Sequence, residues 1–135
     1  MMADLFILAI LGHLVGDYFL QSKKMALEKS KKGKIALQWC TIHCALYTLV
    51  VCVLTWQISP WFALSVFVPH WLIDHFSLAN YWLKLIRGRT FESAFSSNDA
   101  YRDFDISFTA IVYTVVDNSM HFFCLWLSIR FLAFH

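Results

Sequence analysis

The sequence is poor in charge: 15% of its 135 residues are Asp, Glu, Lys or Arg, whereas 59% are hydrophobic. Soluble domains average about 25% charged residues, and a chain of this length cannot bury so much apolar surface in one core. A soluble monomer and a disordered tail are therefore excluded. The net charge of +2 gives no reason to expect a nucleic-acid partner, and the four cysteines lack the paired spacing of a disulfide scaffold. We expect an integral membrane protein with one domain, residues 1–135.

The apolar stretches predict an all-α, polytopic membrane protein with four transmembrane helices. The longest uncharged stretch, residues 35–73, exceeds the length of about 20 residues that one membrane helix needs, and Pro60 stands where a new helix can begin. The first apolar run follows no basic residues and has no small-residue cleavage pattern, so we expect a retained helix rather than a signal peptide. The predicted spans are residues 5–21, 35–57, 60–83 and 106–133.

Basic residues determine the expected orientation. Of the 11 Lys and Arg residues, ten fall in the loops that follow the first and third spans. Because basic loops stay in the cytoplasm, both loops are predicted to be cytoplasmic and both termini to lie on the other side of a bacterial inner membrane. We expect the lysine-rich loop to be solvated, with binding of anionic lipids as the weaker alternative. The ten residues are Lys23, Lys24, Lys29, Lys31, Lys32, Lys34, Lys84, Arg87, Arg89 and Arg102.

Ionisable residues inside the spans form a repeated pattern. Three spans carry a His and an Asp four residues apart, which places both side chains on one helix face, and the second span carries His43. An Asp near the centre of a membrane helix costs about 2.5–3.5 kcal/mol on insertion, so each one needs a physical reason. The pairs are His13 with Asp17, His70 with Asp74, and Asp117 with His121.

The expected topology brings these seven residues to similar depths, between the membrane midplane and the cytoplasmic face. Imidazole and carboxylate groups together favour a divalent transition metal, zinc first, with Mn, Fe or Ni as alternatives. One zinc ion needs three or four protein ligands, so seven suffice for two ions with a bridging carboxylate. The predicted metal ligands are His13, Asp17, His43, His70, Asp74, Asp117 and His121. Asp74 or Asp117 is the predicted bridging group or catalytic general base.

Other polar and small residues of the spans are expected to support this site. His75 lies off the helix face of His70 and Asp74 and is expected only to pack. Gly12 and Gly16 form a ridge of small residues that permits ordinary tight helix packing. The candidates for orienting the ligands through hydrogen bonds are Tyr18, Tyr47, Asn80, Thr114 and Asn118.

The same residues carry a resemblance to a known family. Residues 12–21, GHLVGDYFLQ, contain an H-x3-D-x3-Q motif, which is followed by IHCALYT at 42–48, HWLID at 70–74 and DNSMH at 117–121. In this order the motifs resemble a family of small bacterial and phage inner-membrane proteins that is catalogued as a domain of unknown function. The chain departs from that family at His75 and in the cysteines that flank His43. The resemblance implies a polytopic membrane protein, and the His/Asp pattern is also similar to that of membrane-bound metal-dependent hydrolases.

These observations favour a metal-dependent hydrolase that acts on a lipid or lipid-linked substrate. Three alternatives stay open: a small oligomeric transporter or channel for ions or protons, a non-catalytic membrane partner with a structural metal site, and a metal-free network of His–Asp hydrogen bonds. Membrane lipids and an amphiphilic substrate are the expected partners. A homo-oligomer is left open, and no nucleic acid is expected.

Overall fold

The computed structural model describes residues 2–29, 31, 33–97 and 100–133, and the regular elements of these residues are all helical. The predicted all-α class is therefore confirmed. Lys32, one of the basic residues used for the expected orientation, lies outside the described residues. The elements are α1 (Met2–Leu14), a π-helix (Val15–Phe19), α2 (Lys23–Glu28), α3 (Lys34–Thr55), α4 (Pro60–His75), α5 (Leu78–Arg87), α6 (Phe91–Ser96) and α7 (Arg102–Leu132).

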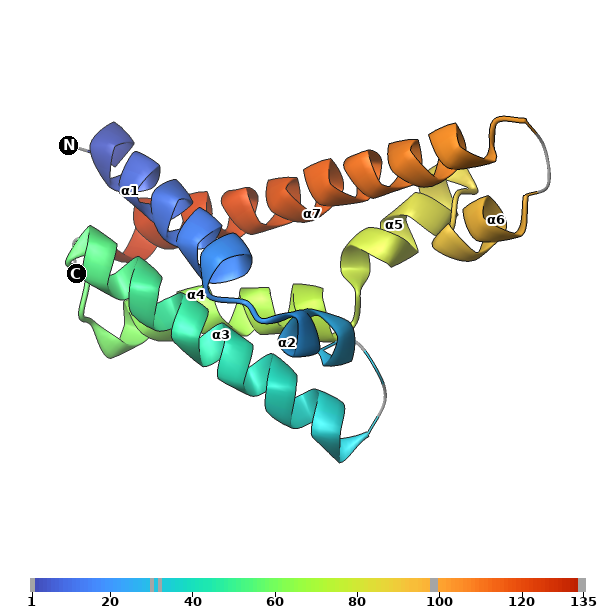
Figure 1. The fold of residues 1–135 in the computed structure, drawn as a ribbon. Helices are drawn as coiled ribbons and strands as arrows, with labels where there is room; N and C mark the ends of the chain where they lie inside the picture. The colour runs from blue at the N-terminus through green and yellow to red at the C-terminus, as the bar shows by residue number, and fades with distance from the viewer. Residues whose placement is uncertain (1, 30, 32, 98–99, 134–135) are drawn as a thin grey trace.

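The helices α1, α3 and α4 pack with the C-terminal half of α7 into a bundle (Figure 1). Their apolar faces meet in one core, where Tyr47, Phe62 and Leu125 are among the largest buried side chains. The N-terminal half of α7 extends away from this bundle and packs against α5 and α6. The start of α1 and the end of α7 lie at the same end of the molecule (Figure 1).

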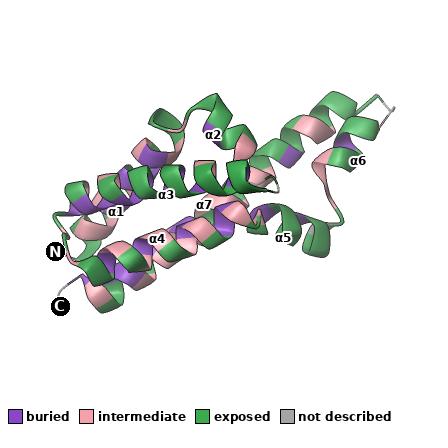
Figure 2. Cartoon of the chain, turned by 90° about the horizontal axis from the view of Figure 1, so that it is seen from below, coloured by how far each residue is buried: buried purple, intermediate pink, exposed green. Residues whose placement is uncertain are grey.

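The outer faces of the bundle are apolar. Figure 2 shows exposed residues along the outward sides of the helices, and many of them are large hydrophobic side chains, including Ile7, Leu49, Val53, Trp61, Leu64 and Phe123. Three helical segments are long and apolar enough to cross a membrane: Met2–Phe19, Lys34–Thr55 and Arg102–Leu132. The pair of α4 and α5 is a fourth when it is counted as one span. Such a surface indicates association with a membrane.

The predicted third span, residues 60–83, is divided in the structure. α4 ends at His75, α5 begins at Leu78, and the two helices are bent by 55°. Ser77 between them has a φ of +48°, in the left-handed region that L-residues rarely adopt. The bend brings α5 against α7, with Ala79 and Leu83 buried. Since no glycine or proline stands at the break, the sequence pattern did not indicate it.

The lysine-rich loop, predicted to be solvated, contains the short helix α2. Ser22 caps this helix, because its hydroxyl accepts a hydrogen bond from the Met25 N–H at 3.2 Å. The side chain of Met25 is buried, and α2 packs against α3. The loop therefore passes over the bundle (Figure 1) and brings Lys29, at the end of α2, to the bundle interior.

Candidate metal centre

The first predicted pair of ligands lies where α1 changes its helical form. His13 is fully buried in the last turn of α1, and Asp17 belongs to the π-helix that continues it. The distance from His13 Nδ1 to Asp17 Oδ2 is 3.7 Å. Gly16 allows this turn to approach α3 closely, because a Cβ at Gly16 would lie 2.7 Å from Tyr47 Cδ2. The spacing predicted the pair but not the π-turn, a feature that is frequent at functional sites.

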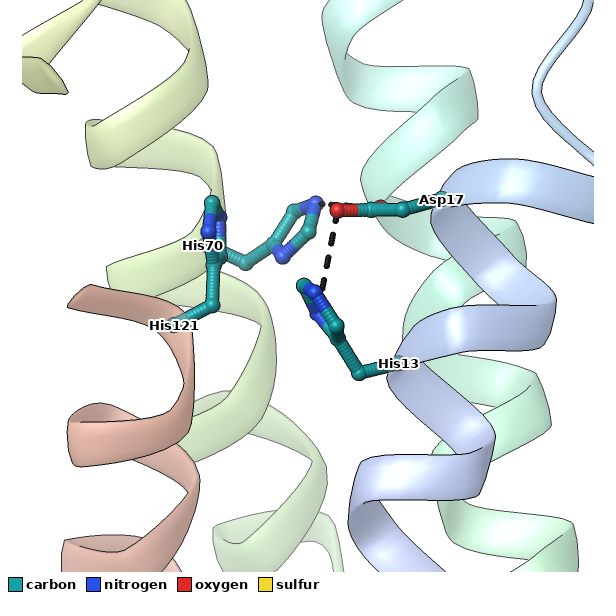
Figure 3. Close-up of side chains that lie close together, drawn as sticks. All are labelled: His13, Asp17, His70 and His121. Atoms are coloured by element: carbon teal, nitrogen blue, oxygen red, sulfur yellow. Dashed lines mark ion pairs between the residues drawn. The ribbon is translucent and has the colours of Figure 1, made fainter. Parts of the chain in front are cut away.

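The structure brings all seven predicted ligands together. Their nitrogen and oxygen atoms form three overlapping sets, and within each set the atoms lie within 4.8 Å of one another. Figure 3 shows the first set, whose side chains extend toward one another from α1, the π-helix, α4 and α7. The sets are His13, Asp17, His70 and His121; His43, His70 and Asp74; and Asp74, Asp117 and His121. These buried groups can hold a metal ion.

His43 on α3 lies at the middle of the cluster. Its Nε2 is 3.1 Å from Asp17 Oδ1 and 3.2 Å from Asp74 Oδ2. The same nitrogen is 3.1 Å from His70 Nε2 and accepts a hydrogen bond of 3.1 Å from Gln21 Nε2. Two carboxylates therefore meet one imidazole in a space where little water enters, and such a group of anions needs positive charge close by.

Three of the seven side chains have a buried atom without a hydrogen bond. These atoms are Asp17 Oδ1, His70 Nδ1 and His121 Nε2, judged against the described part of the chain. A buried polar atom without a partner raises the free energy of the folded state, and coordination to a metal ion would remove that cost. The unpartnered atoms thus fit the chemistry of a metal centre.

His121 has the arrangement of a metal ligand. Its Nδ1 donates a hydrogen bond of 2.8 Å to the backbone carbonyl of Asp117, because a carbonyl oxygen can only accept. The neutral ring then carries its lone pair on Nε2, which lies 3.9 Å from Asp74 Oδ1 and makes no hydrogen bond. Histidines that bind metals usually donate their other N–H in this way, which fixes the tautomer and the ring orientation.

His13 is oriented by a second chain of hydrogen bonds. Asn118 Nδ2 donates to the Tyr18 hydroxyl at 2.6 Å and to the Thr114 carbonyl at 2.7 Å, so its Oδ1 faces His13. His13 Nε2 donates to that oxygen at 2.7 Å, which leaves the lone pair on Nδ1. The Tyr47 hydroxyl donates a hydrogen bond of 3.3 Å to that Nδ1. Asn118, Tyr18 and Tyr47 therefore orient a predicted ligand, as expected, and Thr114 contributes through its backbone.

Other residues considered in the sequence lie outside the three sets of the described chain. His75 stacks on Trp71, with ring centroids 4.5 Å apart, in line with its expected packing role. The sulfur atoms of Cys40 and Cys44 are buried and 4.0 Å apart. The prediction for Asn80 is wrong, because its side chain is exposed on α5 and hydrogen-bonds a neighbouring serine rather than a ligand.

Lys29 belongs to the centre, and sequence analysis missed it. Its Nζ donates a hydrogen bond of 2.7 Å to Asp74 Oδ2, and its side chain is 13% exposed. Burial lowers the pKa of Lys29, but the Asp74 carboxylate raises it, and the pKa stands above its ordinary value. The prediction of a solvated lysine holds for Lys31, which is exposed and paired with Glu28, and is wrong for Lys29. The sequence pattern does not distinguish Lys29 from Lys31. The path of the chain after α2 places Lys29, but not Lys31, beside Asp74.

Comparison with known proteins gives one match. The model of a protein family described as protein of unknown function (DUF3307) matches residues 5–134. Searches of curated proteins and of solved structures find no match. The matched segment includes all seven predicted ligands, Lys29 and the residues that orient His13 and His121.

Proposed function

The chain belongs to the DUF3307 family of proteins of unknown function, so its activity has to be argued from its own site, and we propose a metal-dependent hydrolase of a bacterial inner membrane. Its substrate would be a lipid or a lipid-linked compound. One observation carries the proposal: seven His and Asp side chains from α1, the π-helix, α3, α4 and α7 converge in a buried space, and three of them have an atom without a hydrogen bond to any described residue. Such groups are costly in a membrane protein and usually mark function.

The three overlapping sets divide into two sites of three ligands. One site takes His13, Asp17 and His70, and the other takes Asp74, Asp117 and His121, so that no atom serves twice. His43 lies between them, at 3.1 Å from Asp17 and 3.2 Å from Asp74. Three protein ligands with an open position are typical of catalytic zinc. We propose zinc as the metal, with Mn, Fe or Ni as alternatives.

The residues of the centre can carry out hydrolysis. A divalent ion held by these His and Asp side chains would supply a lowered pKa for a water molecule and polarisation of the substrate. One of the two carboxylates, Asp74 or Asp117, would act as general base instead of as a ligand and accept a proton from the water, whose oxygen forms a bond to the acyl carbon or phosphorus. The bond from that atom to the leaving oxygen or nitrogen breaks, and the leaving group takes up the proton. The reaction adds one water and needs no oxidant or reductant.

An apolar groove supports a lipid-like substrate. A cavity of about 400 Å³ lies between α4 and α7 and is lined mainly by apolar side chains. Two of its lining residues, Ser65 and Cys124, also line the small space beside His70 and His121. The groove therefore lies beside the cluster, separated from it by these two side chains, and a hydrocarbon chain can lie in it.

Activity of purified protein in detergent–lipid micelles tests the proposal. The protein is loaded with zinc and supplied in turn with phosphatidic acid, a monoacylglycerol and a ceramide, which present a phosphoester, an ester and an amide. At least one of them should be hydrolysed, with a loss of about 10²–10⁴-fold in Asp74→Asn and Asp117→Asn. Asp103→Asn, at an exposed carboxylate in the first turn of α7, is the matched control.

The outcome also separates the rival functions. Bound metal without hydrolysis of any substrate, together with unfolding by a chelator, would indicate a structural metal site. Flux of ions or protons through reconstituted vesicles that depends on Asp17 or Asp74 would indicate a transporter instead. Either result would contradict the hydrolase proposal.

A further inference from the structure

Lys29 places a positive charge inside the metal centre. Its ammonium contacts Asp74, whose side chain is 1% exposed. No other Lys or Arg of the described residues forms an ion pair with Asp17, Asp74 or Asp117. The proposed chemistry of the seven His and Asp residues does not require this cation, so its position calls for a separate account.

The ammonium group has unused donors. An ammonium carries three N–H groups, and Asp74 Oδ2 is the only hydrogen-bond acceptor of Lys29 Nζ among the described residues. The remaining N–H groups can therefore donate to a further acceptor at the centre. The four-carbon stem of a lysine is flexible and its charge is compact, which allows Nζ to follow a bound group over a short distance.

The charges of the centre favour an anion as that acceptor. The three carboxylates carry three negative charges when ionised, and Lys29 carries one positive charge. With the two divalent ions of the proposed function, the centre would have an excess of two positive charges. A phosphate monoester has two negative charges near pH 7 and would balance them. A carboxylic ester or an amide is neutral and would leave this excess of positive charge unbalanced.

The surroundings of Lys29 fit the same kind of ligand. The segment that carries it also exposes the basic residues Lys23, Lys24, Lys31 and Lys34. A surface with several positive charges raises the local concentration of anions. Lys29 thus joins this basic segment to Asp74, one of the proposed metal ligands.

We propose that Lys29 binds a phosphate group of the substrate, and that the substrates of this centre are phosphoesters rather than carboxylic esters or amides. This inference rests on the proposed hydrolase function and narrows its substrate class. A lysine ammonium binds phosphate oxygens through charge-assisted hydrogen bonds. The phosphate can belong to a lipid headgroup or to a soluble compound, since the chemistry that Lys29 recognises is the same.

Binding to the zinc-loaded, full-length protein tests this role without requiring turnover. Phosphatidic acid in phosphatidylcholine vesicles is the lipid probe, and inorganic phosphate is the soluble probe. Lys29→Met should weaken the binding of phosphate by about tenfold or more, as expected for loss of a hydrogen bond to a charged group, and Lys29→Arg should retain most of it. Lys31→Met removes an exposed lysine of the same segment and is the matched control. Equal affinity in Lys29→Met and wild-type protein would overturn the proposal.

A measurement on wild-type protein covers the case in which Lys29→Met does not fold. Lysine acetylation is mapped by mass spectrometry with and without inorganic phosphate, at equal ionic strength. Phosphate should slow the modification of Lys29 by about tenfold at saturation, from the same interaction, and leave that of Lys31 unchanged. Equal rates at Lys29 would overturn the proposal. Stronger protection by phosphatidic acid vesicles than by inorganic phosphate identifies the lipid headgroup as the source; the reverse identifies a soluble phosphate.

Failure of this inference and failure of the proposed function give different results. If Lys29 does not bind phosphate, zinc remains bound, and hydrolysis of the monoacylglycerol or ceramide persists in Lys29→Met. If the proposed function is wrong, none of the three lipids is hydrolysed by wild-type protein or by Lys29→Met, whatever Lys29 binds.

Discussion

At the scale of single residues, two histidines of the centre are oriented by hydrogen bonds to different acceptors. His121 donates to the carbonyl of Asp117, and His13 donates to the amide oxygen of Asn118. Both bonds leave the other ring nitrogen with its lone pair, on Nε2 in His121 and on Nδ1 in His13. Because a metal ion needs a lone pair in a fixed direction, the hydrogen bonds around the cluster should affect metal affinity as well as the ligands themselves.

Replacement of Asn118 by Ala should weaken metal binding. The change removes the acceptor that holds the tautomer and orientation of His13, so the affinity for Zn²⁺ should fall by about 10–100-fold, as for other partners of metal ligands. Competition with a zinc-sensitive dye measures the affinity in detergent. Ser119→Ala, at an exposed neighbour on the same helix, should bind as wild-type protein does; equal losses in both variants would contradict the role of Asn118.

Most residues of the centre could be predicted from the sequence. An Asp inside an apolar helix is costly and therefore indicates a function, and a His four residues away lies on the same helix face as its partner. All seven predicted residues are brought together in the structure. Their role as metal ligands stays a prediction. Lys29 could not be predicted, since its contact with Asp74 spans 45 residues of sequence and depends on how α2 folds back over the bundle.

At the scale of the helices, the close approach of α1 and α3 places the first pair of ligands beside His43. A Cβ at Gly12 would lie 3.1 Å from Val51 Cα, and a Cβ at Gly16 would lie 2.7 Å from Tyr47 Cδ2 and 3.2 Å from Tyr47 Cα. The tight packing that the two glycines predict is confirmed. Backbone on one side and a buried ring on the other leave no space for an added methyl group.

Gly16→Ala should therefore destabilise the bundle. Overpacking of a tight contact costs about 1–3 kcal/mol, and the displaced Tyr47 would also move away from His13, which lowers metal affinity. Thermal unfolding in detergent measures the first effect. Ile7→Ala removes an exposed side chain from the same helix and should change the unfolding temperature little. A Gly16→Ala protein as stable as wild type would show that α1 and α3 are less closely packed.

The division of the third span into α4 and α5 changes the expected path of the chain. Asn80 and Lys84 are exposed on one side of α5, and Tyr81 and Leu85 are exposed on another. A helix with these two faces suits the membrane–water interface, with its apolar face toward lipid. Hydrophobicity alone predicted a continuous helix because Phe76 and Ser77 do not interrupt it; packing of α5 on α7 overrides that local preference.

Labelling of single cysteines tests the placement of α5. In a protein whose four natural cysteines are replaced, Asn80→Cys and Lys84→Cys should react with a membrane-impermeant maleimide, because both positions face water. Leu85→Cys should be protected in vesicles and should react only after detergent is added. Equal protection of all three positions would place α5 within the hydrocarbon core and contradict the interfacial position.

At the scale of the whole molecule, a small bundle with an apolar exterior surrounds a polar interior. The core of apolar residues lies toward the end of the bundle where the chain begins and ends, and the His/Asp cluster lies along the same helices nearer to α2. In a membrane, lipid would supply no counter-charge, so the buried carboxylates would be balanced from within the bundle, by Lys29 and by a metal ion of the proposed centre. Metal binding is thus the central claim on which the other proposals depend.

Elemental analysis of protein purified in detergent tests that claim most directly. The account predicts about one or two equivalents of a transition metal per chain, with zinc expected, and a loss of at least one of them in His121→Ala. His75→Ala, which removes a histidine outside the cluster, should retain the wild-type content. A wild-type protein without any transition metal after purification and zinc reconstitution, or an unchanged content in His121→Ala, would contradict the account.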